Sequence, residues 1–278
     1  MESRTILPFD ILEYIVDLLA DGLGLGDYGL EDIESLQMLS QTCKFMVPLC
    51  RKHLFSCLRL HTTSKSERFS NLLSKNPDIA RYVRILEYTV YIPTDNHELN
   101  ILDMLKERSS LQSIELLTVS GFDWRDLPES IRSSLISLIQ LPTITHLVIR
   151  SFKGFPATAL SGCSNLIDLR LVNIEIVPPE ANQVILRSKI PTPVSLYAKT
   201  SLKSYDGLAT LMNSASLRAG GPIVDFSRLQ GAYFDANSGE IGHINELIKA
   251  TTQLLYFYIR GEWLALSLYP SNFWQRIL

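Results

Sequence analysis

The sequence predicts an α/β protein in which three N-terminal helices precede repeated strand-and-return units that form a curved, mainly parallel sheet. Three observations support this. Apolar residues recur at helical spacing over the first sixty residues, a strand-like apolar pattern recurs from about residue 81 onward, and helical or irregular stretches separate its copies. We expect a helical module over residues 1–60 and a larger domain over residues 61–278.

The first helix is predicted to begin near Pro8, because the first turn of a helix tolerates a residue without an N–H. Apolar residues then recur at spacings of three, four and seven, while acidic residues fall on the opposite side. The helix is expected to end where Gly22, Gly24 and Gly26 lower helix propensity. These glycines are interpreted as an interhelical loop, because a nucleotide-binding glycine motif requires a preceding strand.

Helical spacing resumes at Ile33, Leu36 and Leu39, and an apolar stripe continues to Leu54. Pro48 must either begin a third helix within its first turn or kink it. The chain has 4 cysteines, which we interpret as buried, reduced thiols because their spacing lacks the tight pairs of a zinc site. The cysteines are Cys43, Cys50, Cys57 and Cys163.

Two segments of the first sixty residues resemble an F-box. They are Leu7-Pro8-x-x-Ile11-Leu12-x-x-Ile15-x-x-Leu18 and Leu36-x-x-Leu39-x-x-Thr42-Cys43-Lys44, and the run from Pro48 to Ser56 is similar to the third-helix end of many fungal F-box proteins. Met46 stands where most members carry tryptophan, and the glycine loop is longer than usual.

The resemblance implies a partner for this module, the Skp-type adaptor of a cullin–RING ubiquitin ligase. Three short helices bury too little apolar surface to be robust alone, so a partner for a remaining apolar face is physically reasonable. The alternative is that this face packs on the rest of the chain. The contact residues implied by position are Leu7, Pro8, Ile11, Leu12, Ile15, Leu36, Leu39, Cys43 and Met46.

The remaining chain carries the pattern L-x-x-L-x-L, which is typical of the strand of a leucine-rich repeat. It begins at Leu111, Ile144 and Leu166, and Leu254 begins a copy with an aromatic substitution. Weaker copies begin at Val83 and Leu229 and lie near residues 194–199, and return helices are expected around 99–106, 131–139, 208–212 and 244–250.

An irregular leucine-rich-repeat-like solenoid is the predicted architecture, because such units bury their apolar faces only by stacking on neighbours. The asparagine that usually follows the strand is absent; Val119, Phe152, Ile174 and Glu262 stand there. An ordinary α/β domain remains an alternative, because strand–helix alternation alone does not distinguish the two.

Within L-x-x-L-x-L, the intervening side chains point to the opposite, concave face of the strand. They mix charge with aromatics, as binding surfaces often do, although simple exposure to solvent also explains each of them. Ser113 and Val148 share this face. The candidate target-binding residues are Glu115, His146, Arg150, Asp168, Arg170, Tyr256, Tyr258 and Arg260.

Bulk composition and motifs restrict the function classes. A formal charge of -3 gives no basic footprint for nucleic acid or anionic lipid, and we find neither a signal peptide nor a long apolar span, so we expect an intracellular protein without a membrane segment. An H-E-x-x-H search that begins at His97 fails at Ile101, and no other catalytic motif is found. We therefore expect no cofactor, no metal and no enzymatic activity.

The sequence thus favours a non-catalytic substrate-recognition subunit of an SCF-type ligase, which binds the adaptor through the F-box and a target protein through the repeats. The alternatives are a repeat scaffold whose N-terminal helices cap the solenoid, and a small-molecule-binding or hydrolytic α/β domain. Leu264-x-Leu266-x-Leu268 suggests a further repeat. The final aromatic residues either fold back as a cap or lead into a longer natural chain.

Overall fold

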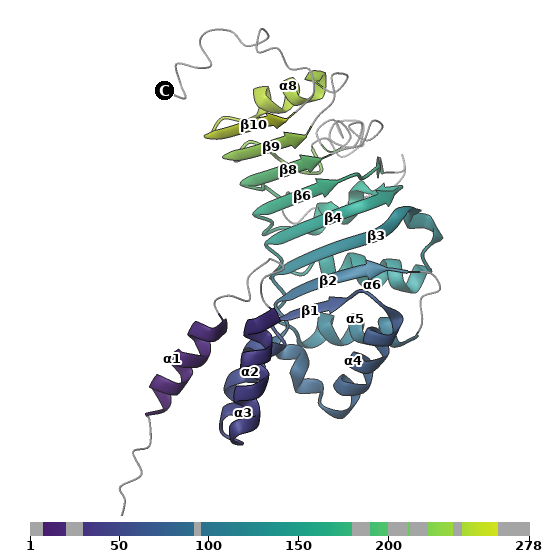
Figure 1. Ribbon diagram of the computed structural model, residues 1–278. Coiled ribbons are helices and arrows are strands. Elements are labelled where there is room, and N and C mark those ends of the chain that lie inside the picture. Colours follow the sequence, from purple (N-terminus) through teal and green to yellow (C-terminus); the bar gives the residue numbers. More distant parts are fainter. Residues whose placement is uncertain are drawn as a thin grey trace, which may run out of the picture.

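The computed structural model describes residues 8–20, 30–91, 96–179, 190–199, 211, 222–235 and 241–260. Within them, three N-terminal helices precede a sheet of parallel strands (Figure 1). The predicted α/β class with a mainly parallel sheet is therefore confirmed. The glycine loop after the first helix, most of the helix expected at 208–212 and the apolar pattern at 264–268 lie outside the described residues.

The N-terminal helices are α1 (Phe9–Ala20), α2 (Leu30–Thr42) and α3 (Met46–Leu54). Pro8 lies just before α1, and Pro48 lies in the first turn of α3, where its missing N–H costs no hydrogen bond. Pro48 thus lies in the first turn of a new helix and does not kink a longer one. The sheet begins at Cys57, before the domain boundary expected after residue 60.

The main sheet has 8 strands, and their spatial order follows their order in the chain. Every neighbouring pair is parallel. The strands predicted from weak copies of the apolar pattern are present as well as those from the strong copies. The strands are β1 (Cys57–Leu60), β2 (Ile85–Val90), β3 (Ser113–Asp123), β4 (His146–Lys153), β6 (Asp168–Val172), β8 (Ser195–Lys199), β9 (Gly231–Asp235) and β10 (Tyr256–Arg260).

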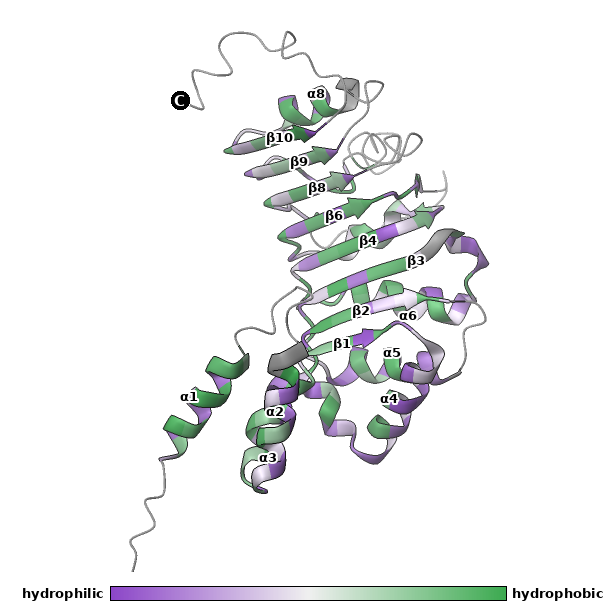
Figure 2. Ribbon diagram, viewed as in Figure 1, coloured by the Kyte–Doolittle hydropathy of each residue, from purple (hydrophilic) through white to green (hydrophobic). Residues whose placement is uncertain are grey.

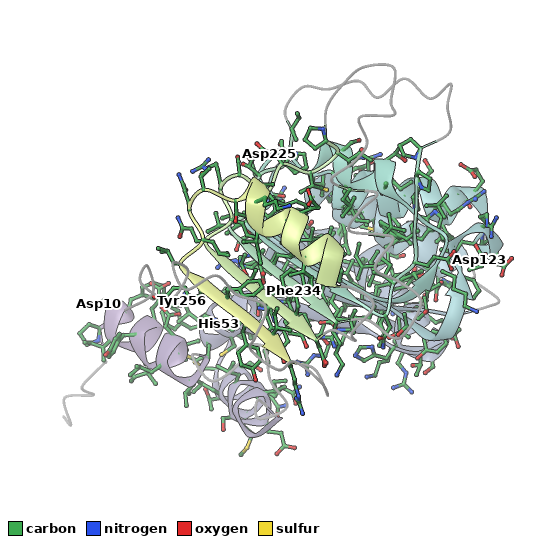
Figure 3. The ribbon with its side chains drawn as sticks, turned by 90° about the horizontal axis from the view of Figure 1, so that it is seen from above. Asp10, His53, Asp123, Asp225, Phe234 and Tyr256 are labelled. Atoms are coloured by element: carbon green, nitrogen blue, oxygen red, sulfur yellow. The ribbon has the colours of Figure 1, made fainter. Side chains whose placement is uncertain are left out.

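Helices and short turns connect the strands and cover one face of the sheet. Figure 1 shows α5 and α6 behind the strands and α8 beside β10, and Figure 3, seen from above, shows Phe234 on the side of α8. The connecting elements are α4 (Thr63–Lys75), η3 (Pro77–Tyr82), α5 (Asn96–Arg108), η4 (Trp124–Asp126), α6 (Glu129–Ile139), η5 (Ala157–Gly162) and α8 (Ile241–Ala250), and a two-stranded sheet pairs β5 (Phe155–Pro156) with β7 (Ile176–Val177).

Alternation along each strand sends one set of side chains into the core and the other to the open face of the sheet. Leu86, Ile114, Leu147 and Leu169 follow one another across neighbouring strands, and all four are buried. The first apolar residue of most copies of the pattern, such as Leu111 or Ile144, is buried too, whereas Leu254 is half-buried. Among the described residues, no helix covers the open face (Figure 1).

Aromatic packing occupies the place where a regular repeat has its asparagine. Phe152 is buried and packs against Trp124 and Phe155, with ring centroids 5.7 Å and 6.2 Å away. Ile174 is buried as well. Apolar packing therefore fills these two positions.

The cysteines follow the prediction only in part. All four are free, but Cys43 is exposed and lies between α2 and α3, so the four are not uniformly buried. Burial raises the pKa of Cys57 to about 11 and that of Cys163 to about 12. These two thiols therefore stay protonated near neutral pH, which makes them poor nucleophiles.

The buried rows of apolar side chains that cross the sheet, such as the row that contains Leu147, should dominate its stability. Leu147→Ala removes a fully buried side chain, and we expect it to lower the free energy of unfolding by about 2–5 kcal/mol. Leu255→Ala, at a leucine that is 62% exposed, is the control and should change it by less than about 0.5 kcal/mol. Urea unfolding followed by circular dichroism measures both. Equal losses would contradict the assignment of the core face.

Candidate interaction surfaces

The three N-terminal helices have an apolar core of their own. Val16 and Ala20 of α1 pack with Leu36 of α2 and with residues of α3, and all are buried. This core is a separate cluster from the core of the sheet domain. Leu54 packs on the first cluster and Phe55 on the second, so the two cores meet at adjacent residues. The α3 residues of this core are Met46, Leu49 and Cys50.

Two residues that the sequence assigned to adaptor contact belong to this core. Leu36 is fully buried, and Met46 is nearly so, because both point inward between the helices. Their side chains stabilise the module and are not part of its surface, so we correct their assignment. Leu12 and Leu39 are half-buried against the same core. Leu7 lies outside the described residues.

A second set of apolar side chains on these helices is exposed. Ile11 and Ile15, two of the predicted contact residues, belong to it, and Pro8 and Cys43 are exposed as well. Figure 2 shows hydrophobic residues along much of α1. We call this set the exposed apolar face. It consists of Phe9, Ile11, Tyr14, Ile15 and Leu18 on α1, Met38 on α2, and Phe45 before α3.

Five members of this face were not among the predicted contact residues. Tyr14 is 61% exposed, Leu18 is 51% exposed and Met38 is 72% exposed. Phe9 and Phe45 make an edge-to-face contact with ring centroids 5.1 Å apart, which joins α1 to the turn before α3. Helical spacing places Tyr14 and Leu18 on one side of α1, so the signal for those two was present in the sequence.

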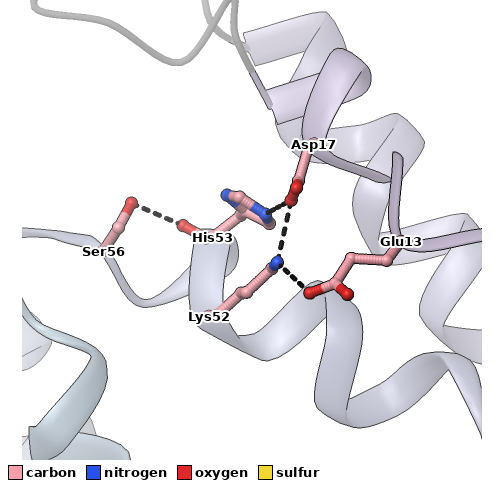
Figure 4. Close-up of polar contacts among 5 residues, drawn as sticks. All are labelled: Glu13, Asp17, Lys52, His53 and Ser56. Atoms are coloured by element: carbon pink, nitrogen blue, oxygen red, sulfur yellow. Dashed lines mark hydrogen bonds and ion pairs between the residues drawn. The ribbon is translucent and has the colours of Figure 1, made fainter. Parts of the chain in front are cut away.

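A polar network also joins α1 to α3 (Figure 4). The Lys52 ammonium lies 2.8 Å from Glu13 and 2.9 Å from Asp17, and the His53 ring contacts Asp17 at 2.8 Å. The hydrogen bond from Lys52 lowers the pKa of the Asp17 carboxyl. Burial acts against the charge of Lys52, but its bonds to Glu13 and Asp17 outweigh this and raise the pKa of that ammonium.

The open face of the sheet is the second candidate surface. Because register is kept across the strands, its side chains form rows that cross the sheet. Several charged side chains of this face are paired. Two pairs join register partners on neighbouring strands: Arg59 with Glu87 at 3.0 Å and Lys199 with Asp235 at 3.5 Å. Two join adjacent rows: Arg150 with Glu115 at 2.6 Å, across strands, and Arg170 with Asp168 at 2.7 Å, along β6.

All eight predicted target-binding residues lie on this open face, but in different surroundings. Glu115 and Arg150 neutralise each other, and Asp168 is almost buried beside Arg170. His146 is exposed, and its Nδ1 contacts the Thr145 hydroxyl at 2.8 Å. The other three, Tyr256, Tyr258 and Arg260, are exposed on β10.

Two aromatic residues of the open face were missed by sequence reasoning. Tyr197 of β8 and Tyr233 of β9 stack with ring centroids 4.6 Å apart, and Tyr233 stacks on Tyr258 at 4.9 Å. We call Tyr197, Tyr233 and Tyr258 the tyrosine ladder. Their signal was positional, because each occupies the same place in its strand, but the strands of Tyr197 and Tyr233 carry weak copies of the apolar pattern.

Comparisons with known proteins add no family: no protein-family model and no curated protein sequence matches the chain. Among the described helices, none is long and apolar enough to cross a membrane. No cluster of three or more potential metal ligands occurs in the part of the chain that the structure describes. The candidate surfaces are therefore argued from their own geometry.

The network around Lys52 should hold α1 against α3. Lys52→Ala leaves Glu13 and Asp17 without their shared cation, and we expect amide exchange in α1 to become a few-fold faster, since partly exposed pairs contribute only about 0.2–1 kcal/mol. Arg51→Ala on the same helix is the control, because Arg51 makes no ion pair within the described chain. Equal exchange in both variants would contradict the role of the network.

Acid should weaken the same link in the wild type. The pKa of Asp17 is depressed in the folded state, so its contribution is fully present above the unfolded value near 3.8 and is lost as the pH falls through the lower folded value. We expect Asp17→Asn to remove this acid-dependent change. Exchange rates in α1, normalised to intrinsic rates and measured on either side of pH 3.8, test it.

Proposed function

We propose that this chain is the non-catalytic substrate-recognition subunit of an SCF-type, cullin–RING ubiquitin ligase. In this role the N-terminal helices are an F-box that binds a Skp-type adaptor, and the following domain is a degenerate leucine-rich-repeat solenoid that binds a target protein. The observation that carries the proposal is the exposed apolar face on a module whose own core is already complete.

The energetics of this face favour a partner. Fully burying a side chain such as leucine or isoleucine contributes about 1.5–3 kcal/mol, and the apolar side chains of this face are still 38–72% exposed. A contiguous exposed apolar patch on a small helical module is typical of an interaction site. Its location on the segments that resemble an F-box supports the Skp-type adaptor as that partner.

The proposed adaptor contacts follow from exposure. We retain Pro8, Ile11, Ile15 and Cys43 from the resemblance and add the other members of the exposed apolar face. Leu12 and Leu39 support the face from beneath, because they are half-buried against the module core. Leu36 and Met46 act indirectly by holding the helices together.

Sequential strand order supports the repeat interpretation of the second domain. Each strand of the main sheet pairs with the strand of that sheet that comes next in the chain, and the return elements lie on the opposite side from the open face (Figure 1). In Figures 1 and 3 the N-terminal helices lie beyond β1 and project toward the side of the open face. A target on the open face would therefore share a side of the sheet with the adaptor. Holding target and ligase in one complex raises the effective concentration of the target at the ligase.

The alternative is a repeat scaffold without a ligase role, in which the N-terminal helices cap the first strand. The separate module core weighs against it, because a cap is expected to merge its apolar residues with the core of the repeats. Contact between α3 and η3 joins the two parts, whereas the exposed residues of α1 are left out of both cores.

Adaptor binding should require the exposed apolar face. Ile15→Asp with Leu18→Asp places two charges at exposed positions, so the fold should persist, while each buried charge would cost several kcal/mol in a complex. We expect the double variant to lose co-purification with the Skp-type adaptor. Leu72→Asp with Val177→Asp, two comparably exposed apolar positions elsewhere, is the matched control and should bind normally.

Unchanged adaptor binding by the folded Ile15→Asp, Leu18→Asp protein would sink the assignment of this face. Circular dichroism and gel filtration establish that it is folded. Absence of adaptor binding by the wild-type chain would remove the ligase role and leave the scaffold.

Hydrogen exchange separates docking from capping. If α1 docks the adaptor, amides of α1 should exchange readily in the isolated chain and become protected at least tenfold when the adaptor is added. If α1 is a cap, protection in the isolated chain should match that of the neighbouring sheet and stay constant. The measurement is peptide-level exchange with and without adaptor.

A further inference from the structure

We propose that the tyrosine ladder is the docking site for an extended, proline-containing segment of the target that carries an acidic residue near Arg260. This inference rests on the part of the proposed function that assigns target binding to the open face. It does not depend on adaptor binding, because the ladder lies on β8, β9 and β10, at the end of the sheet opposite the N-terminal helices (Figure 1).

The ladder is rigid before any ligand arrives. Its rings are nearly parallel, with interplanar angles of 7° and 14°, and parallel strands hold their backbones in register. Stacking uses both faces of Tyr233 and one face each of Tyr197 and Tyr258, so the ring edges and hydroxyl groups of the ladder are left for a partner. A surface whose side chains are already ordered loses little conformational entropy on binding.

The phenolic hydroxyls provide the polar chemistry of the site. Within the described chain, no hydrogen bond is found for the hydroxyls of Tyr197, Tyr233 or Tyr258. A phenol readily donates to a carbonyl oxygen. The ladder therefore offers a row of donors set in an apolar strip, and it suits a ligand that presents unpaired acceptors and apolar rings together.

A shelf of small residues runs beside the ladder. Ser195 and Gly231 are neighbours in the adjacent row, followed by Tyr256, which is 76% exposed. A Cβ built on Gly231 meets no atom within 4 Å, so open space lies above this glycine. A ring of the ligand can therefore pack over Gly231, between Tyr256 and the ladder.

The charged residues beside the ladder indicate which charge the ligand should carry there. In the third row, Lys199 is paired with Asp235, and in the neighbouring strand Arg170 is paired with Asp168. Arg260, the neighbour of Asp235 on β10, forms no ion pair within the described chain. Among the described residues, the uncompensated charge at this end of the open face is therefore positive, and its complement is a carboxylate.

A polyproline II segment satisfies these conditions together. It has no internal hydrogen bonds, so its carbonyls are free to accept from phenols, and its proline rings pack on aromatic edges. With a rise of about 3.1 Å per residue, roughly three residues cover the two ladder steps of 4.6 Å and 4.9 Å. Proline-rich segments also dock at small entropic cost, because the extended form is already populated.

Direct binding of synthetic peptides to the full chain tests the proposal without the adaptor. The probe is a fluorescein-labelled peptide of repeated Pro-Pro-Glu units, followed by fluorescence anisotropy. Two peptides of equal length are the controls: repeated Pro-Pro-Lys, which reverses the charge, and repeated Gly-Ser-Glu, which keeps the charge and loses the polyproline form. We expect the Pro-Pro-Glu peptide to bind at least tenfold more tightly than either control.

Variants locate the site. Tyr233→Ala breaks the ladder at its centre and should weaken binding at least tenfold. Gly231→Leu should do the same by filling the shelf, at a position where an added Cβ meets no atom within 4 Å. Replacing the three ladder tyrosines by phenylalanine keeps the stacking and removes only the donors, so binding should weaken several-fold. Val148→Ala, in the same row but on β4, is the matched control and should bind as the wild type does.

Absence of binding by the folded wild type, or equal binding of all three peptides, overturns the proposal. Binding that persists in both Tyr233→Ala and Gly231→Leu overturns the location. The co-purification experiment on the exposed apolar face is independent, so a failed peptide experiment with intact adaptor binding rejects the ladder site alone. Absence of adaptor binding by the wild-type chain, with intact peptide binding, rejects the ligase role alone.

Discussion

The parallel register of the main sheet is the constraint on which the rest of the structure depends. Each strand alternates between the helix-covered face and the open face, and the pairing is continuous from β1 to β10 through the leucine rows. A slip of one residue would reverse the two faces of a strand, which would bring a residue such as Arg170 into the core. Burial of one face thus determines which side chains gather on the other.

The N-terminal module follows from a different constraint, the width of the apolar arc on α1. Val16 and Ala20 satisfy the module core, whereas Ile11, Ile15 and Leu18 continue the apolar surface around the helix. A helix with one partner needs one apolar stripe, and a wider arc indicates a second contact. The polar network of Lys52 links α1 to α3 in an orientation in which Val16 and Ala20 are buried and the rest of the apolar arc is exposed.

Sequence patterns predicted the structure correctly where local periodicity and burial coincide. The class, the three N-terminal helices and the strands that follow Leu111, Ile144 and Leu166 were predicted from that coincidence, whereas α4 was not predicted. Helical periodicity identifies an apolar stripe but does not show which of its residues face the neighbouring helices and which face solvent. Leu36 and Met46 were therefore assigned to the surface although they are buried. The tyrosine ladder was missed for a related reason, because stacking of Tyr197 on Tyr233 requires the register between separate strands.

The two candidate surfaces differ in the physics that makes each suitable for a partner. The exposed apolar face offers apolar surface that a partner can remove from water. Such a surface fits a permanent or slowly exchanging partner whose own apolar surface is complementary. The open face is mostly self-paired: Arg150 with Glu115 and Arg170 with Asp168 gain little from a new partner, because a ligand would have to break existing ion pairs. Selectivity on that face is therefore concentrated where groups lack such partners, at the ladder hydroxyls and Arg260. Under the proposed function, the exposed apolar face would hold the constant partner at one end of the molecule, and the ladder and Arg260 would select exchangeable targets at the other.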